Sequence, residues 1–141
     1  MNQLRLARIF LAEDNPDDVE ITRRALKRRR LGCELMVARN GEEAVELLCR
    51  PDVSPHLALL DINLPRLTGL EVLERIRREP SCLALPVVML SASNQRKDVL
   101  RSYELGANSY IQKPVAFEDF VDALEVLYKY WFELASLPRS L

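Results

Sequence analysis

Hydrophobic residues fall in short runs along the chain, and most runs lead into a segment with helical spacing of apolar positions. Five such runs, most of them apolar throughout, stand at residues 9–12, 35–38, 57–60, 86–90 and 108–111. Apolar runs of this length without alternation are typical of strands buried on both faces of a sheet. The pattern therefore predicts five β-strands.

A helix is expected after each strand. The first has the clearest start, with Asn15 as cap, Pro16 at the first helical position and Asp17 and Asp18 in the first turn. Gly32 is expected to end it. The other helices are predicted at residues 41–49, 69–78, 95–105 and 117–136.

Five strands alternating with five helices predict an α/β fold with a doubly wound parallel sheet. Right-handed crossovers and sites at the carboxyl ends of strands favour the flavodoxin-like order 2-1-3-4-5. No repeat or linker indicates a second unit, so we predict one domain over residues 1–141. Its core is expected at about residues 5–127, and a C-terminal helix extension at about 128–137. We expect no output domain, since only four residues follow Leu137.

Composition narrows the class of protein. The 141 residues are 48% hydrophobic and 29% charged with a net charge of -1, which favours neither nucleic-acid nor membrane binding. No apolar stretch is long enough to span a bilayer, and residues 1–5 lack a signal-peptide core. The spacing of Cys33, Cys49 and Cys82 predicts neither disulfides nor a zinc site, so we expect a reducing cytoplasm.

Polar and ionisable residues follow four of the predicted strands. They are Glu13 and Asp14 after the first strand, Asp61 and Asn63 after the third, Ser91 after the fourth and Lys113 after the fifth. In a parallel sheet these positions share one edge, and the first and third strands are neighbours in the predicted order. Carboxylates that close repel one another unless a cation neutralises them, and Mg²⁺ prefers oxygen ligands. The sequence therefore predicts a magnesium site.

Five separate motifs carry a family resemblance. The stretches "AEDNPDD", "LLDINLP", "TGLEVLERIR", "PVVMLSAS" and "GANSYIQKP" occur in this order. Over about residues 5–127 the chain resembles the receiver domains of two-component response regulators, although Leu67 and Thr68 stand where Met and Asp are more usual. The resemblance implies a stand-alone signalling protein, not an enzyme. It would accept a phosphoryl group from a histidine kinase in a Mg²⁺-dependent reaction and signal through altered protein contacts.

At the acidic positions, the resemblance implies that Asp61 accepts the phosphoryl group. Asp14 and Asp61 would bind Mg²⁺ directly, Glu13 would hold a metal-bound water, and Asn63 would offer its backbone carbonyl. Phosphoryl transfer needs chiefly in-line positioning and charge neutralisation, which these groups can provide.

At the remaining positions, the resemblance implies that Lys113 places a positive charge opposite the metal and that Ser91 is the switch hydroxyl. Tyr110 matches an aromatic residue that rotates between exposed and buried positions in the family. From sequence alone, an ordinary amphipathic tyrosine at a strand edge is the favoured explanation of Tyr110.

The basic run at residues 23–30 has several interpretations. A solvated helix face, with cations favourable near a helix C-terminus, is simpler than nucleic-acid binding. The resemblance adds kinase docking around Ile21 and Ala25. The stretch "EDNPDDVEITRRAL" and the aromatic C-terminus most resemble single-domain regulators paired with bacterial phytochrome kinases.

Two other functions share features with this pattern. A flavodoxin-like electron carrier shares the predicted fold, but the acidic loop at residues 13–18 would repel a flavin phosphate. A metal-dependent phosphatase with an Asp-x-Asp nucleophile needs its nucleophile after the first strand, whereas Asp61 and Asn63 follow the third. The receiver interpretation fits better than either.

Aromatic residues concentrate at the C-terminus. A helix over residues 117–136 would be about 30 Å long, whereas a five-residue strand spans about 17 Å. We therefore expect the last turns to overhang the sheet and expose Tyr128, Trp131 and Phe132. Large exposed apolar surface usually marks an interface, so the sequence predicts a homodimer through these residues. The alternative is that Leu137 and Pro138 fold the end back onto the domain.

Overall fold

The structure is a computed structural model that describes residues 6–139 and residue 141. Its five strands are Ala7–Ala12 (β1), Cys33–Ala38 (β2), Leu57–Leu60 (β3), Val87–Ser91 (β4) and Ser109–Gln112 (β5). All pair in parallel, in the order β2-β1-β3-β4-β5 that the sequence predicts. Residues 1–5, which bear on the expected absence of a signal peptide and on the start of the core, lie outside the described residues.

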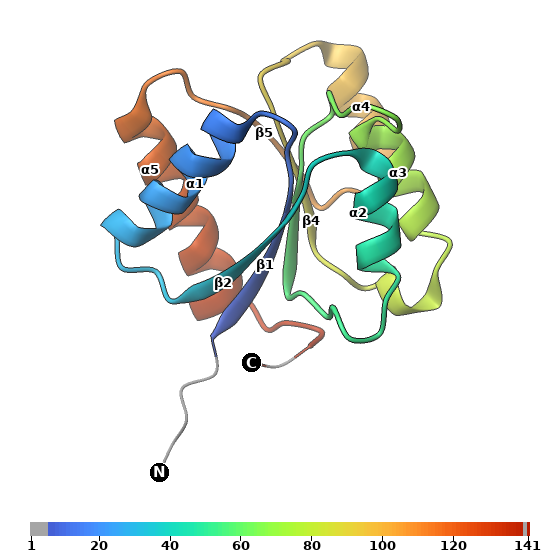
Figure 1. Cartoon of the computed structure of the whole chain (residues 1–141), viewed down its shortest axis with the longest axis horizontal. Coiled ribbons are helices and arrows are strands. Elements are labelled where there is room, and N and C mark those ends of the chain that lie inside the picture. The colour runs from blue at the N-terminus through green and yellow to red at the C-terminus, as the bar shows by residue number, and fades with distance from the viewer. Residues whose placement is uncertain (1–5, 140) are drawn as a thin grey trace.

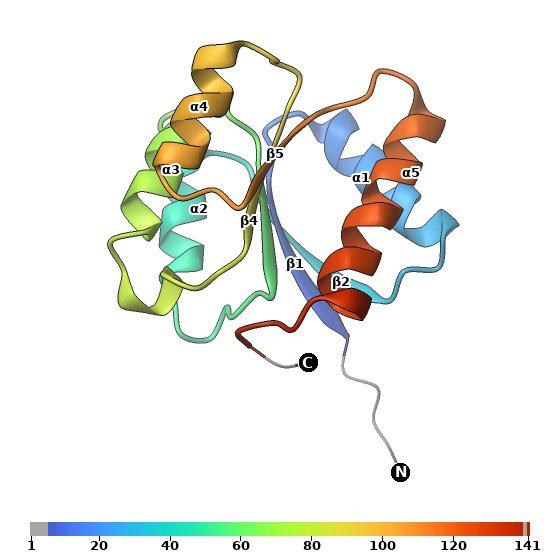
Figure 2. The same ribbon diagram turned by 180° about the vertical axis from the view of Figure 1, so that it is seen from behind.

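Helices cover both faces of this sheet. They are α1 (Pro16–Arg28), α2 (Gly41–Leu48), α3 (Gly69–Ile76), α4 (Arg96–Glu104) and α5 (Phe117–Lys129), with a 3₁₀ turn at Pro80–Cys82 and a π-helical turn at Tyr130–Leu134. Helices α1 and α5 lie on one face and α2, α3 and α4 on the other (Figures 1 and 2). The predicted doubly wound architecture is confirmed. Among the described residues, no helix combines the length and apolar character needed to cross a membrane.

The apolar strand runs are explained by two hydrophobic clusters, one under each layer of helices. In β1, Ile9 and Leu11 belong to the cluster under α1 and α5, whereas Phe10 belongs to the cluster under α2 and α3. All four residues of β3 are buried, and alternate ones enter different clusters. Successive strand residues point to opposite faces, so a strand covered on both sides needs apolar residues throughout.

Helix α1 starts as predicted but ends early. The Asn15 side chain accepts a hydrogen bond from the Asp17 N–H at 2.9 Å, and Pro16 is the first helical residue. The helix ends at Arg28, before the predicted stop at Gly32, because Arg30 turns the chain with a φ of 54°. An arginine therefore takes the left-handed position expected of a glycine.

Two arginines near the end of the basic run form ion pairs with a second helix. Arg28 pairs with Glu118, and Arg29 pairs with Asp122 and Glu125 of α5, at 2.5–2.6 Å. These side chains are partly exposed, so each pair contributes little to stability. The predicted solvated face therefore also bridges two helices.

The two residues expected at a kinase contact are not equally available on the surface. Ala25 is fully buried against the sheet and cannot contact a partner, so that part of the expectation is wrong. Ile21 is partly exposed.

The parallel register brings the ends of four strands to one edge, here called the carboxyl edge, which lies at the top of Figure 1. Ala12 pairs with Leu60, so Glu13 and Asp61 follow paired positions on adjacent strands. The Asp61 N–H donates to the Ala12 carbonyl at 3.1 Å, and the Lys113 N–H donates to the Ser91 carbonyl at 2.7 Å. The backbone ladder thus collects the predicted site residues.

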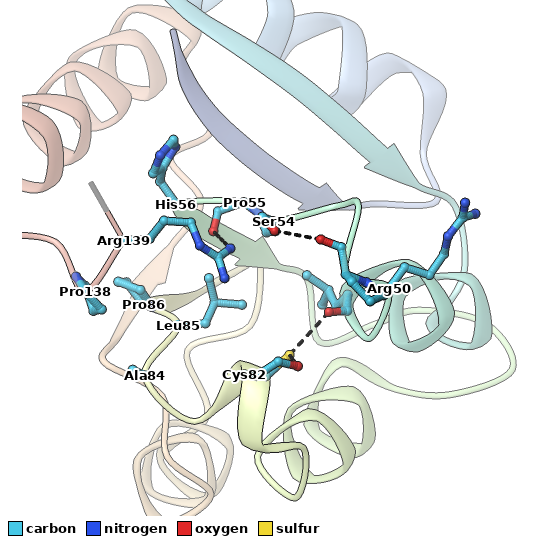
Figure 3. Close-up of a pocket in the computed structure, with 13 residues that line it drawn as sticks. Arg50, Ser54, Pro55, His56, Cys82, Ala84, Leu85, Pro86, Pro138 and Arg139 are labelled. Atoms are coloured by element: carbon cyan, nitrogen blue, oxygen red, sulfur yellow. Dashed lines mark hydrogen bonds between the residues drawn. The ribbon is translucent and has the colours of Figure 1, made fainter. Parts of the chain in front are cut away.

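The C-terminal segment does not overhang the sheet as predicted. After the π-helical turn, Ala135 is extended and the chain returns beneath the sheet. There the Arg139 guanidinium donates to the Pro55 carbonyl at 3.4 Å, beside a cavity of about 370 Å³ (Figure 3). Pro138 and Arg139 border this cavity together with residues that precede β3 and β4. This opposite side of the sheet is called the amino edge below.

The terminal aromatic residues largely pack against their own chain. The Tyr128 hydroxyl donates to the Gly32 carbonyl at 2.9 Å, and the Phe132 ring meets the buried His56 ring edge-on at 6.2 Å between centroids. Trp131 is half-buried against the α1–α5 cluster, with its ring 4.9 Å from that of Tyr130. The expected exposure of Tyr128, Trp131 and Phe132 is therefore wrong, because all three cover apolar surface of their own chain.

Exposed apolar side chains are present on the same helix, but they are different residues. Val126, Tyr130 and Leu134 are 67%, 48% and 78% exposed, respectively. Their spacing of four residues places them on one side of α5 and its extension. The extended C-terminal helix therefore still presents an apolar stripe, rotated away from the predicted one.

Candidate functional site

Three carboxylates meet at the carboxyl edge, as the sequence predicts. One oxygen from each of Glu13, Asp14 and Asp61 lies within 4.8 Å of the others. Glu13 and Asp61 are buried, whereas Asp14 is exposed. Like charges at this separation favour protonation or a bound cation.

Lys113 supplies the opposite charge. Its ammonium donates to Glu13 Oε1, and it lies 3.3 Å from Asp61 Oδ2 and 3.3 Å from Asp18 Oδ2. Burial acts against the ammonium, but the Glu13 hydrogen bond and the charges of all three acids outweigh it and raise the pKa of Lys113. Lys113 is therefore a fixed cation in the site.

Glu13 titrates unusually high for a carboxylic acid. Burial raises its pKa to about 6, with a smaller contribution from the Asp61 charge, and the hydrogen bond and charge of Lys113 offset this only in part. A carboxylate in such a position is unstable without further positive charge.

The loop after β3 holds Asp61 in place. The Asn63 N–H donates to Asp61 Oδ1 at 3.2 Å, and a Cβ at Gly69 would sit 2.1 Å from the Asp61 carbonyl oxygen. Only a glycine allows α3 to start this close to the loop. Thr68 and Glu71 form a reciprocal capping box at the same helix end. Thr68, an unusual residue for this motif, is therefore well suited to its position.

Ser91 and Tyr110 are connected through Ser93, which lies between them. Ser91 is fully buried, and its Oγ accepts from the Ser93 N–H at 3.2 Å. The Tyr110 hydroxyl donates to the Ser93 carbonyl at 2.5 Å. One loop residue thus contacts both predicted switch residues.

The site contains two residues that the sequence analysis missed. Asp18 was treated only as a first-turn acid of α1, although its carboxylate contacts Lys113. Its position in the first turn of a helix that starts at the carboxyl edge could have indicated that it lies near the site. Ser93 gave no signal, because a third residue of the "SAS" stretch has no obvious role without coordinates.

The residues at the carboxyl edge fit a divalent cation. The donor set is all oxygen and includes buried carboxylates, which is the chemistry that Mg²⁺ and Mn²⁺ share. The raised pKa of Glu13 is a second sign that this edge lacks positive charge. Asn63 lies in the loop after β3, two residues from Asp61, so its backbone carbonyl is near the cluster in sequence.

A model of the response regulator receiver domain matches residues 9–125. The chain belongs to this family. The resemblance seen in the five sequence motifs is confirmed, and family members are signalling proteins. The match begins inside β1, covers the other four strands and ends inside α5.

The chain is similar in sequence and fold to phytochrome response regulators. Response regulator Rcp1 of Synechocystis sp. is 34% identical over 137 residues, which cover 94% of this chain and 93% of Rcp1. The phosphorylated cyanobacterial phytochrome response regulator RcpA is 34% identical with a TM-score of 0.88, covering 96% of this chain and 100% of RcpA. The Mn²⁺-bound form of Rcp1 is 33% identical with a TM-score of 0.83, covering 94% and 99%.

Proposed function

We propose that this chain is a cytoplasmic response regulator that accepts a phosphoryl group on Asp61 from a histidine kinase. The observation that carries the proposal is the cluster of Glu13, Asp14 and Asp61 facing the Lys113 ammonium. In the transfer, an Asp61 oxygen forms a bond to phosphorus, and the bond from phosphorus to the kinase imidazole nitrogen breaks. The imidazole leaves, and an acyl phosphate remains on Asp61.

Mg²⁺ is the cofactor in this proposal. Asp14, Asp61 and the Asn63 backbone carbonyl would hold it directly, and Glu13 would hold it through water. The ion supplies charge neutralisation for an anionic phosphoryl group. The comparison in support is the Mn²⁺-bound form of Rcp1. Lys113 neutralises a second part of the charge, and its compact ammonium suits a point contact to a phosphoryl oxygen.

The test is labelling with a phosphorylated histidine kinase. We expect Asp61→Asn to abolish acid-stable, base-labile labelling, because the nucleophile is lost while the side chain keeps its size. Asp52→Asn is a suitable control, since Asp52 is exposed and Arg50 is its only ion-pair partner among the residues that the structure describes. Labelling of Asp61→Asn at the wild-type stoichiometry would refute the assignment. Catalytic turnover of phosphate esters would instead favour a phosphatase.

A phytochrome kinase is the proposed source of the phosphoryl group. RcpA is described as a phytochrome response regulator, and the chain matches it over almost its whole length. Labelling should therefore be faster from a phytochrome kinase than from an unrelated histidine kinase. Equal rates from both kinases would refute the phytochrome kinase as the specific donor, while the proposed phosphorylation of Asp61 would still stand.

Signal output is proposed to run from Ser91 to Tyr110. A phosphoryl oxygen would accept a hydrogen bond from the Ser91 hydroxyl, which now accepts one from Ser93. Moving Ser91 would disturb the Ser93 carbonyl that Tyr110 binds, and so change the protein contacts near α4 and β5. Ser91→Ala should accept phosphate without passing on the signal. Normal signalling by this variant would disprove the coupling.

We further propose a homodimer through α5 and its extension. In support, Val126, Tyr130 and Leu134 form an exposed apolar stripe, and the half-buried Trp131 adjoins it. Tyr130→Ala combined with Leu134→Ala should give a folded monomer by sedimentation, whereas wild type should be a dimer at micromolar concentration. Trp131→Ala combined with Phe132→Ala should affect stability as well as association, because Phe132 packs internally.

A further inference from the structure

The Lys113 ammonium has three carboxylate neighbours, and they are not equivalent. Glu13 and Asp61 belong to the cluster that fits a divalent cation, whereas Asp18 does not. Asp18 lies 3.3 Å from Nζ on the first turn of α1, with its side chain 38% exposed. It is the contact of Lys113 that remains outside the metal cluster.

The Lys113 side chain must cross part of the carboxyl edge to reach Glu13, so its ammonium needs a contact near α1 to hold it there. Lys113 follows β5, whereas Glu13 follows β1, and two other strands lie between these two in the sheet. The side chain therefore extends along the carboxyl edge towards α1, where Asp18 meets its end. A four-carbon side chain has large rotamer freedom and stays extended only if contacts at its tip hold it.

The surroundings strengthen the contact with Asp18. A cavity of about 120 Å³ beside it is lined by Asp18, Lys113 and mostly apolar residues, among them Ile21 and Phe117. Ion pairs next to apolar walls are screened less than those in open water. Asp18 itself lies in the first turn of a capped helix, so its backbone is fixed beside Lys113.

We propose that Asp18 is a positioning residue that keeps the Lys113 ammonium directed at Asp61. This role rests on the proposed phosphoryl transfer. Glu13 and Asp61 would share their charge with a bound cation, and a cation repels the ammonium. Asp18 lies outside the metal cluster and keeps its contact with Lys113. It therefore holds the ammonium at the carboxyl edge, where the phosphoryl group would arrive.

The experiment compares phosphorylation rates with the small donor acetyl phosphate in Mg²⁺ buffer. Asp18→Asn should lower kcat/KM about fivefold, the effect of one partly exposed charge contact. Asp18→Glu should restore most of the rate. Asp17→Asn is the matched control, because Asp17 has the same charge in the same first turn and lacks a contact with Lys113 among the described residues. Its rate should stay within about twofold of wild type.

A double variant separates positioning from bulk charge. In a Lys113→Ala background, Asp18→Asn should cause no further loss, because its effect passes through Lys113. An equal loss in that background would overturn the proposal. So would a faster rate for Asp18→Asn in the wild-type background, which would mean that Asp18 acts only by repelling the anionic donor.

A second readout is independent of phosphorylation. Lys113 is one of four lysines, so its ammonium can be followed by NMR in Mg²⁺ buffer without any phosphoryl donor. Asp18→Asn should increase the mobility of the Lys113 side chain, and Asp17→Asn should not. An unchanged Lys113 signal would refute positioning. If wild type accepts no phosphate at all, the proposed function fails, while this measurement still tests the contact.

Discussion

The two edges of one sheet have opposite chemistry. At the carboxyl edge, buried carboxylates surround a lysine, and burial raises the pKa of Glu13 to about 6. At the amino edge, the buried His56 accepts a hydrogen bond from the Arg8 N–H and packs against the Phe132 ring. Within the described part of the chain, no carboxylate lines the cavity there. The amino edge stabilises the fold, whereas the carboxyl edge holds charges that the fold alone would not favour.

This difference follows from the direction of the strands. All five run in parallel, so each edge collects one kind of connection. Loops at the carboxyl edge lead into helix N-termini, which are suited to anions. The amino edge receives the helix C-termini and the returning C-terminal segment. Changes at the two edges should therefore separate stability from phosphorylation.

The largest expected effect on stability comes from the amino edge. Phe132→Ala should lower the free energy of unfolding by about 2–3 kcal/mol, because it leaves a void against His56. Urea unfolding measures this, and labelling of Asp61 should persist. Leu83→Ala is the control, since Leu83 is 61% exposed, lies outside the proposed dimer stripe and should change stability by less than about 0.5 kcal/mol. Equal losses for the two variants would mean that Phe132 does not pack as described.

At the carboxyl edge, loss of charge should stabilise the protein. The pKa of Glu13 is about 6 in the fold against 4.5 for the free group. The folded state therefore binds the extra proton between these values, and stability falls as pH rises through that window. In metal-free buffer, Glu13→Gln should gain about 2 kcal/mol relative to wild type between about pH 4 and pH 7.

The same titration affects the metal. Protons compete for Glu13 below about pH 6, so the Mg²⁺ affinity of wild type should fall there. Glu13→Gln should bind Mg²⁺ more weakly than wild type above about pH 6, and the difference should shrink at lower pH, as measured by calorimetry. If Glu13→Gln is less stable than wild type at neutral pH in metal-free buffer, the prediction of a gain in stability is wrong and Glu13 stabilises the fold.

A smaller effect is expected at the start of α3. Thr68→Ala removes one half of the capping box and should lower the free energy of unfolding by about 1 kcal/mol. Thr68→Ser keeps the oxygen and should recover most of this. Because α3 starts beside Asp61, the alanine variant should also slow phosphorylation slightly. A stability equal to wild type would argue that Glu71 caps this helix alone.

The smallest effect is expected from Arg139→Ala. Among the residues that the structure describes, the side chain makes a single long hydrogen bond, to the Pro55 carbonyl. Its removal should change stability by less than about 0.5 kcal/mol. A loss as large as that of Phe132→Ala would show that the returning segment depends on this contact.

The sequence alone determined the sheet and most of its site. Apolar runs identified the strands, caps such as Asn15 located the helix starts, and polar residues after the strands identified Glu13, Asp61 and Lys113. These signals are local, because periodicity and capping depend on residues a few positions apart. Parallel order then brings strand ends together without any knowledge of side-chain packing.

Only the tertiary structure decided contacts between distant residues. Asp18 and Lys113 are 95 positions apart, and no local pattern relates a helical acid to a lysine after the last strand. The return of the C-terminal segment, which buries Phe132 against His56, is also non-local. Helical periodicity shows which residues share a face, but not whether that face meets the same chain. The free energy of covering apolar surface chooses between the two, and it depends on the whole assembled fold.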